Sequence, residues 1–97
     1  MALVTSKEML TKARKGGYAV GAFNAENMEM VKAIIAAAEE LKAPVMIQTT
    51  PSTVKYGTSA TYAAIVKAEA EKASVPVCMH LDHGSSYELA EECIGNG

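Results

Sequence analysis

Two kinds of apolar segment alternate along this chain of 97 residues, and this alternation most restricts the folds that the chain can adopt. Short apolar runs typical of strands occupy residues 18–24, 45–47 and 74–81. Each run is followed by a longer segment in which apolar residues recur at helical spacing. Such alternation predicts parallel strands joined by right-handed crossovers, with helices covering the sheet, so we expect an α/β fold.

The expected helices are marked by signals at their ends. Thr5 and Glu8 form a capping box that opens the first helix, and Gly16 and Gly17 stop it. The other expected helices cover residues 28–41, 61–73 and, from a second capping box that starts at Ser85, 85–94. Between the second strand and the third helix we expect a loop that passes through Gly57.

Charge and hydropathy argue against two classes of function. The net charge is −2, and basic residues gather only at Lys12, Arg14 and Lys15, which argues against a dedicated nucleic-acid binder. No apolar run approaches the roughly 18 residues of a membrane span. We therefore expect neither a nucleic-acid partner nor a membrane.

The N-terminus and the cysteines indicate a cytoplasmic protein. The first residues lack the basic and apolar regions of a secretory signal. Cys78 and Cys93 lie far apart in apolar surroundings, so we expect two reduced, buried thiols rather than a disulfide.

The third apolar strand ends in an ionisable cluster made of His80, Asp82 and His83, followed by Gly84. Burying such groups costs several kcal/mol unless they are paired or bound to a metal, so the cluster indicates a site. Residues two apart in a strand share a face, so His80 and Asp82 are expected to point the same way. His83 is expected to lie in a turn that Gly84 permits. One metal ion could not easily bind both histidines, so it would need ligands from other strands.

All three strands turn polar where they end, at Asn24, at residues 48–50 and at residues 80–83. In α/β folds this carboxyl edge of the sheet is where sites are built. The chain has no G-x-G-x-x-G and no Walker-type loop, so the nucleotide-binding folds lose support. The favoured architecture is a TIM (β/α)8 barrel.

A whole barrel takes about 250 residues, so this chain supplies an N-terminal helix and about the first three βα units. An open three-stranded sheet would expose an apolar face and an unpaired edge. We therefore expect residues 1–97 to be the N-terminal portion of one barrel domain, either as a fragment or as a chain that assembles with others.

Two segments carry a resemblance to a known family: Gly21-Ala22-Phe23-Asn24, and Pro76 to Gly84 with its H-L-D-H-G sequence. The chain resembles the class II fructose-bisphosphate aldolases over all 97 residues, and the tagatose-bisphosphate aldolases of the same group equally. The resemblance implies a zinc-dependent enzyme of carbohydrate metabolism. It would reversibly cleave a ketose 1,6-bisphosphate to glycerone phosphate and glyceraldehyde 3-phosphate. Fructose and tagatose substrates are not distinguished.

The resemblance also implies roles for the residues of the cluster. His83 would bind the catalytic zinc, which stabilises the enediolate, and Asp82 would donate and accept the proton of the C4 hydroxyl. A carboxylate can serve as such a general acid and base, although Asp82 could instead cap the helix that follows. The other two zinc histidines would come from later strands.

The remaining candidate residues lie at all three strand ends. Asn24 would contact the substrate, and Gln48 and Thr50 would lie beside the site as further substrate-binding residues. His80 is better explained as a residue held by hydrogen bonds behind the zinc site than as a ligand. The family also implies a monovalent cation and a homodimer or homotetramer.

Two other functions stay open. The chain could be a non-catalytic partial barrel that acts as an assembly module, and the 97 residues alone are expected to be inactive because three protein ligands are the usual minimum for catalytic zinc. A different barrel enzyme with the same strand-end pattern is the third possibility.

Overall fold

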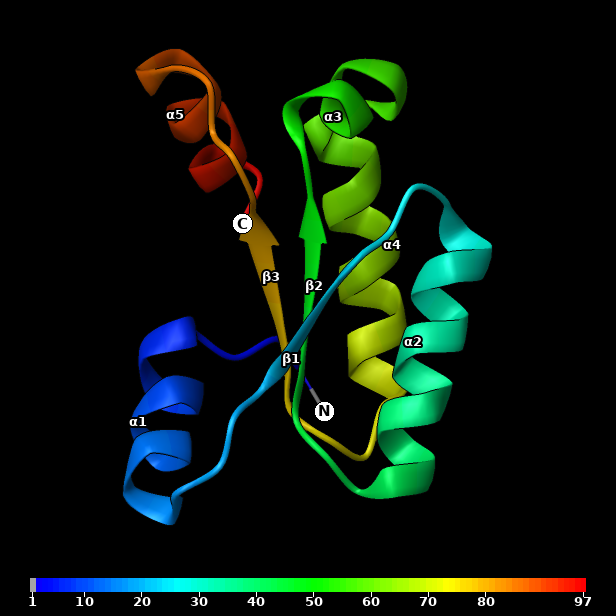
Figure 1. Cartoon of the computed structure of the whole chain (residues 1–97). Coiled ribbons are helices and arrows are strands. Elements are labelled where there is room, and N and C mark those ends of the chain that lie inside the picture. Colours follow the sequence, from blue (N-terminus) through cyan, green and yellow to red (C-terminus); the bar gives the residue numbers. More distant parts are fainter. Residues whose placement is uncertain (1) are drawn as a thin grey trace.

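The computed structural model describes residues 2–97, which form a three-stranded parallel sheet with helices on both faces (Figure 1). The elements in chain order are α1 (Ser6–Gly16), β1 (Gly21–Asn24), α2 (Met28–Leu41), β2 (Val45–Thr49), α3 (Pro51–Gly57), α4 (Ser59–Lys72), β3 (Val77–Leu81) and α5 (Tyr87–Gly95). The strands lie in the order β1-β2-β3, and both pairings are parallel. The predicted α/β architecture is confirmed.

Alternate residues along the strands point to opposite faces of the sheet and pack into two separate cores. Val45, Ile47 and Val77 point toward α2 and α4, where they pack with residues such as Val31 and Val66. Burying each of these aliphatic side chains stabilises the fold by roughly 1.5–3 kcal/mol. This layer of the molecule therefore supplies most of the apolar packing.

The opposite face of the sheet has a smaller core near the amino ends of the strands. Met9 of α1 packs against Met46 and Cys78, and all three are buried. In Figure 1, α1 lies beside the amino ends of the strands and leaves their carboxyl ends uncovered on this face. Side chains further along the same face, at positions 48 and 80, are therefore free of α1.

The first helix begins and ends as predicted. Thr5 is its N-cap and accepts a hydrogen bond from the Glu8 amide at 3.3 Å, while Gly17 takes the left-handed conformation with φ 70°. At the last helix the prediction is wrong by one residue. Ser86, rather than Ser85, accepts the Leu89 amide at 3.1 Å.

β2 begins at Val45 as predicted, whereas β1 and β3 begin later than predicted because their starts depend on pairing. Pro44 precedes β2, which begins at Val45, and the neighbouring strands begin level with it: Gly21 pairs with Val45, and Val45 with Val77. The registered pairs begin at Gly21 and Val77, and of the residues before them Pro76 still accepts a hydrogen bond from the Val45 amide at 3.1 Å. β1 and β3 are the two edge strands, and every residue of β1 is exposed.

One helix was not predicted. Residues 51–57, expected as a loop, form α3. The local signal was Pro51 at the first helical position, preceded by the extended Thr50. Seven residues are too few to show a helical period, so apolar spacing did not reveal this helix. None of the helices in the described residues is long and apolar enough to cross a membrane.

Candidate functional site

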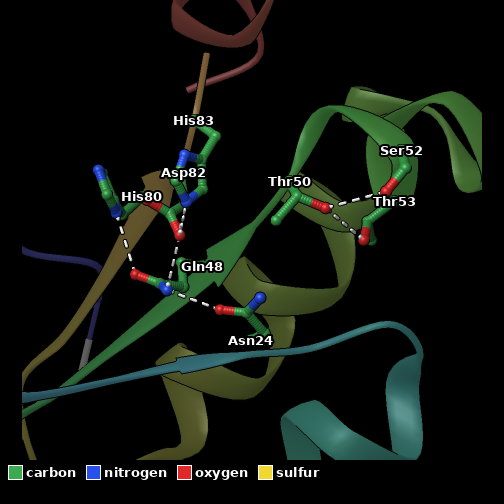
Figure 2. Close-up of polar contacts among 8 residues, drawn as sticks. All are labelled: Asn24, Gln48, Thr50, Ser52, Thr53, His80, Asp82 and His83. Carbon is green, nitrogen blue, oxygen red and sulfur yellow. Dashed lines mark hydrogen bonds and ion pairs between the residues drawn. The ribbon is translucent and has the colours of Figure 1, made fainter. Parts of the chain in front are cut away.

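The side-chain amide of Gln48 joins the three strand ends into one hydrogen-bonded cluster (Figure 2). Its Nε2 donates to Asn24 Oδ1 at 2.6 Å and to Asp82 Oδ2 at 3.1 Å. Its Oε1 lies 3.2 Å from His80 Nδ1. We call these four residues the amide cluster. Four of the six predicted site residues therefore form this cluster, in which Gln48 contacts each of the other three.

Strand register explains why these residues meet. Asn24 pairs with Gln48, and Gln48 pairs with His80, so the three side chains leave the same face of the sheet. The Asp82 amide donates to the Thr49 carbonyl at 2.8 Å, which continues the ladder one residue past β3. The Asp82 side chain thus returns to the face of His80. The expectation that these two point the same way is confirmed.

His83 lies in the turn that ends this strand, but the turn is made differently from the prediction. His83 itself has φ 56°, in the left-handed region, and Gly84 does not have a positive φ. Histidine is one of the non-glycine residues that adopt this region more readily. The His83 Nε2 lies 3.6 Å from Asp82 Oδ2, and its side chain is 82 % exposed. Asp82 does not cap α5, because Ser86 does.

Thr50 stands apart from the amide cluster. Its hydroxyl contacts Ser52 Oγ at 3.2 Å and Thr53 Oγ1 at 3.1 Å, and within the described residues it makes no hydrogen bond to the cluster. Thr53 in turn donates to Glu26 Oε2 at 2.9 Å. Sequence reasoning missed Thr53 and Glu26 because both contacts depend on α3, which was expected to be a loop.

The amide cluster is open to solvent. Asn24 and His80 are exposed, and Gln48 and Asp82 are half-buried. A cavity of about 620 Å³ lies instead between β3, α4 and α5, lined mainly by apolar residues such as Met79, Leu81 and Ala63. Met79 belongs to the helix-covered core, so most of this cavity is on the other side of the sheet from the amide cluster.

Neither of the two cysteines is activated as a nucleophile or as a metal ligand. Both cysteines are free; Cys78 is buried and Cys93 half-buried. Burial raises the pKa of the Cys78 thiol, and burial together with the Glu92 charge raises that of Cys93. Both thiols are therefore protonated at neutral pH, and neither is a thiolate ligand or nucleophile.

The chain matches the family fructose-bisphosphate aldolase class-II over residues 4–97. It belongs to the class II fructose-bisphosphate aldolase family. A fructose-bisphosphate aldolase from Thermus caldophilus is 50 % identical over 95 residues, which are 98 % of this chain and 31 % of that protein. The corresponding aldolase from Geobacillus stearothermophilus is 46 % identical over 100 residues, covering 100 % of this chain and 35 % of its own length.

The fold comparison agrees with the family. The crystal structure of the YdjI aldolase from Escherichia coli K12 superposes with a TM-score of 0.89 at 34 % sequence identity, over 98 % of this chain and 37 % of that one. The chain thus spans about a third of the length of the relatives it matches. Its three βα units correspond to the N-terminal third of a class II aldolase TIM barrel.

Class II aldolases are zinc-dependent, so the described residues can be tested as a metal site. Within residues 2–97 there is no group of three or more histidine, cysteine, aspartate or glutamate side chains placed to hold a metal ion. His83 fits one ligand position, because its imidazole is exposed at the carboxyl edge and lies beside a carboxylate that can orient it. Residues 2–97 thus hold no complete metal site.

Proposed function

We propose that residues 1–97 form the N-terminal portion of one TIM-barrel domain of a zinc-dependent class II aldolase. The enzyme reversibly cleaves a ketose 1,6-bisphosphate to glycerone phosphate and glyceraldehyde 3-phosphate. The observation that carries the proposal is the hydrogen-bonded cluster of Asn24, Gln48 and Asp82 at the carboxyl edge of the sheet, in a chain of this family.

Asp82 is the proposed proton donor and acceptor. In the cleavage direction its carboxylate takes the proton of the substrate C4 hydroxyl, and the bond between C3 and C4 breaks. C4 becomes the aldehyde carbon, and the electron pair stays with the ketone fragment. The Asp82 side chain is 27 % exposed, so a substrate can reach it. Proton transfer by a placed carboxylate contributes about 10² to 10⁴-fold in rate.

His83 is the proposed zinc ligand in this part of the chain. When bound, zinc supplies a Lewis acid that polarises the ketone and offsets the negative charge formed as the carbon-carbon bond breaks. Three protein ligands are usual at catalytic zinc, so at least two would come from residues outside the described part. For the same reason we expect the purified 97-residue chain to show no turnover alone.

Asn24 and Thr50 are the proposed substrate-binding residues, with Gln48 at the centre of the cluster and His80 behind it. Asn24 can donate two hydrogen bonds from Nδ2 to sugar oxygens. The names of the relatives favour fructose 1,6-bisphosphate over the tagatose isomer as substrate. A monovalent cation, a cytoplasmic location and a homodimer or homotetramer are further parts of the proposal.

The test uses the intact enzyme that carries this sequence. Asp82→Ala is expected to lower kcat by at least about 10²-fold while zinc stays bound, because the proton carrier is lost but no ligand is. His83→Ala is expected to lower both zinc occupancy, measured by metal analysis, and turnover. Glu40→Ala, which removes an exposed carboxylate on α2, is the matched control. Wild-type turnover in Asp82→Ala would refute the assigned role.

A further inference from the structure

Gln48 uses more of its hydrogen-bonding capacity inside the protein than any other member of the amide cluster. We infer that Gln48 is a positioning residue: its amide fixes the orientation of Asn24 and Asp82 and the tautomer of His80, and it does not itself contact the substrate. This inference rests on the proposed function for its catalytic consequence, but its structural part stands on the observed hydrogen bonds alone.

Both donors of the Gln48 amide are occupied. A glutamine NH₂ group has two N–H donors, and here one meets Asn24 Oδ1 at 2.6 Å and the other Asp82 Oδ2 at 3.1 Å. The carbonyl oxygen faces His80 at 3.2 Å. No donor remains for a ligand hydroxyl or phosphate oxygen, so a substrate could gain one only by breaking a bond of the cluster.

The charge of Asp82 sets the direction of every bond in the cluster. An ionised carboxylate only accepts hydrogen bonds, so the nitrogen end of the Gln48 amide must face Asp82. The oxygen end then faces His80, and because that oxygen can only accept, His80 Nδ1 must carry the proton. His80 is thereby held as the Nδ1–H tautomer when neutral, with a lone pair on Nε2.

The same reasoning fixes what Asn24 presents. Its Oδ1 accepts from Gln48, which leaves both N–H groups of Nδ2 without a hydrogen-bond partner in residues 2–97. Asp82 Oδ1 is free in the same sense, since Gln48 and His83 both approach Oδ2. The exposed edge therefore offers donors from Asn24 and an acceptor from Asp82. That polarity suits a ligand hydroxyl, which needs a donor for its oxygen and an acceptor for its proton.

Gln48→Met tests the inference because methionine nearly keeps the volume of glutamine and removes all three hydrogen bonds. In ¹⁵N NMR spectra of the intact enzyme, the imidazole signals of His80 are those that disappear in His80→Asn. The spectra are recorded well above the usual histidine pKa of about 6.5. We expect the Nδ1–H tautomer for His80 in the parent chain and a shift toward the ordinary tautomer mixture in Gln48→Met.

Gln48→Glu is the second variant and covers a failure of Gln48→Met to fold. It keeps the shape and an acceptor for His80 Nδ1 but replaces the donors by oxygen atoms, so the bonds to Asn24 and Asp82 are lost. In this variant kcat should fall while His80 stays the Nδ1–H tautomer, and an unchanged kcat would contradict the positioning role. Lys55→Gln, an exposed change on α3, is the control and should leave the His80 spectrum unchanged. A His80 already in the Nε2–H form in the parent chain, or an unchanged tautomer in Gln48→Met, would overturn the inference.

Kinetics of the intact enzyme separate positioning from substrate contact. A misplaced carboxylate costs up to about 10²-fold in rate, so Gln48→Met is expected to lower kcat by about 10 to 10²-fold with a smaller change in KM. A raised KM at unchanged kcat would show direct substrate contact and overturn the inference. If the parent enzyme has no aldolase activity, the proposed function fails, and the His80 tautomer still decides the positioning role.

Discussion

Three glycines face an aromatic ring at the same distance, and we predict that only one of them resists replacement by alanine. A Cβ added at Gly57 would lie 2.6 Å from a ring carbon of Tyr62, one at Gly16 would lie 2.6 Å from Tyr18, and one at Gly21 would lie 2.6 Å from Phe23. Contacts this short force a movement. The outcome depends on whether the ring can move.

The side chain of Tyr62 is buried and hydrogen-bonded, so its ring has little room to move. Its side chain is 3 % exposed, and its hydroxyl donates to the Glu26 carbonyl at 2.8 Å. Tyr18 and Phe23, by contrast, are 48 % and 52 % exposed, so their rings can rotate into solvent. Gly57 and Gly16 are each the last residue of their helix, which makes them a matched pair.

The expected magnitude follows from this difference. Overpacking against a fixed core side chain costs about 1–3 kcal/mol. Replacing a helical glycine by alanine returns about 0.5–1 kcal/mol of backbone entropy, a gain that both variants share. Gly57→Ala should therefore be less stable than Gly16→Ala by about 1–3 kcal/mol.

Urea unfolding followed by circular dichroism measures both free energies of unfolding. Tyr62→Leu in the Gly57→Ala background shortens the side chain, so a double-mutant cycle should show a favourable coupling between the two changes. Equal stabilities of Gly57→Ala and Gly16→Ala would refute the reasoning, because they would mean that the Tyr62 ring moves as freely as an exposed one.

Two further predictions concern the thiols and a surface charge network. Cys93 is half-buried and Cys78 buried, so maleimide should label Cys93 first, and both more slowly than a free thiol because their pKa values are raised; equal rates would contradict the packing. Hydrogen bonds from Lys32 and Lys72 lower the pKa of the Glu69 carboxyl. Its contribution to stability is thus fully present above the ordinary value of 4.5 and is lost as the pH falls through the lowered pKa. Glu69→Gln should lower the urea midpoint at pH 7, and the difference from the parent chain should shrink as the pH falls below 4.5; a difference that stays constant with pH would contradict this.

The ends of the first helix could be predicted from the sequence because residues only a few positions apart determine them. Gly17 ends α1 in the left-handed region and Thr5 caps it, as the sequence predicted, because both signals involve residues a few positions apart. The starts of β1 and β3 were predicted too early because pairing with β2, rather than apolar character, sets them. Ser85 and Ser86 carry the same side chain, so only the backbone after the His83 turn decides which one caps α5.

The site could be predicted in part for the same reason. Asn24, Gln48, His80 and Asp82 were recognisable as polar residues at carboxyl ends of parallel strands, and register brings them together. Their hydrogen bonds were not predictable, because they depend on which side chain reaches across two strands. Thr50 was grouped with them, yet Pro51 starts α3 immediately after it and its hydroxyl bonds to Thr53 instead.

A single face of the sheet thus divides into two parts along the strand direction. At the amino end Met46 and Cys78 are buried under α1, and two residues further along Gln48 and His80 form the amide cluster. A period of two puts these pairs on one face, but α1 covers only the first of them. Substitutions at Met46 are therefore expected to change the free energy of unfolding, whereas those at Gln48 act on groups that solvent already reaches. One face of the sheet thus holds both the residues buried under α1, which stabilise the fold, and the residues of the amide cluster, which belong to the proposed site.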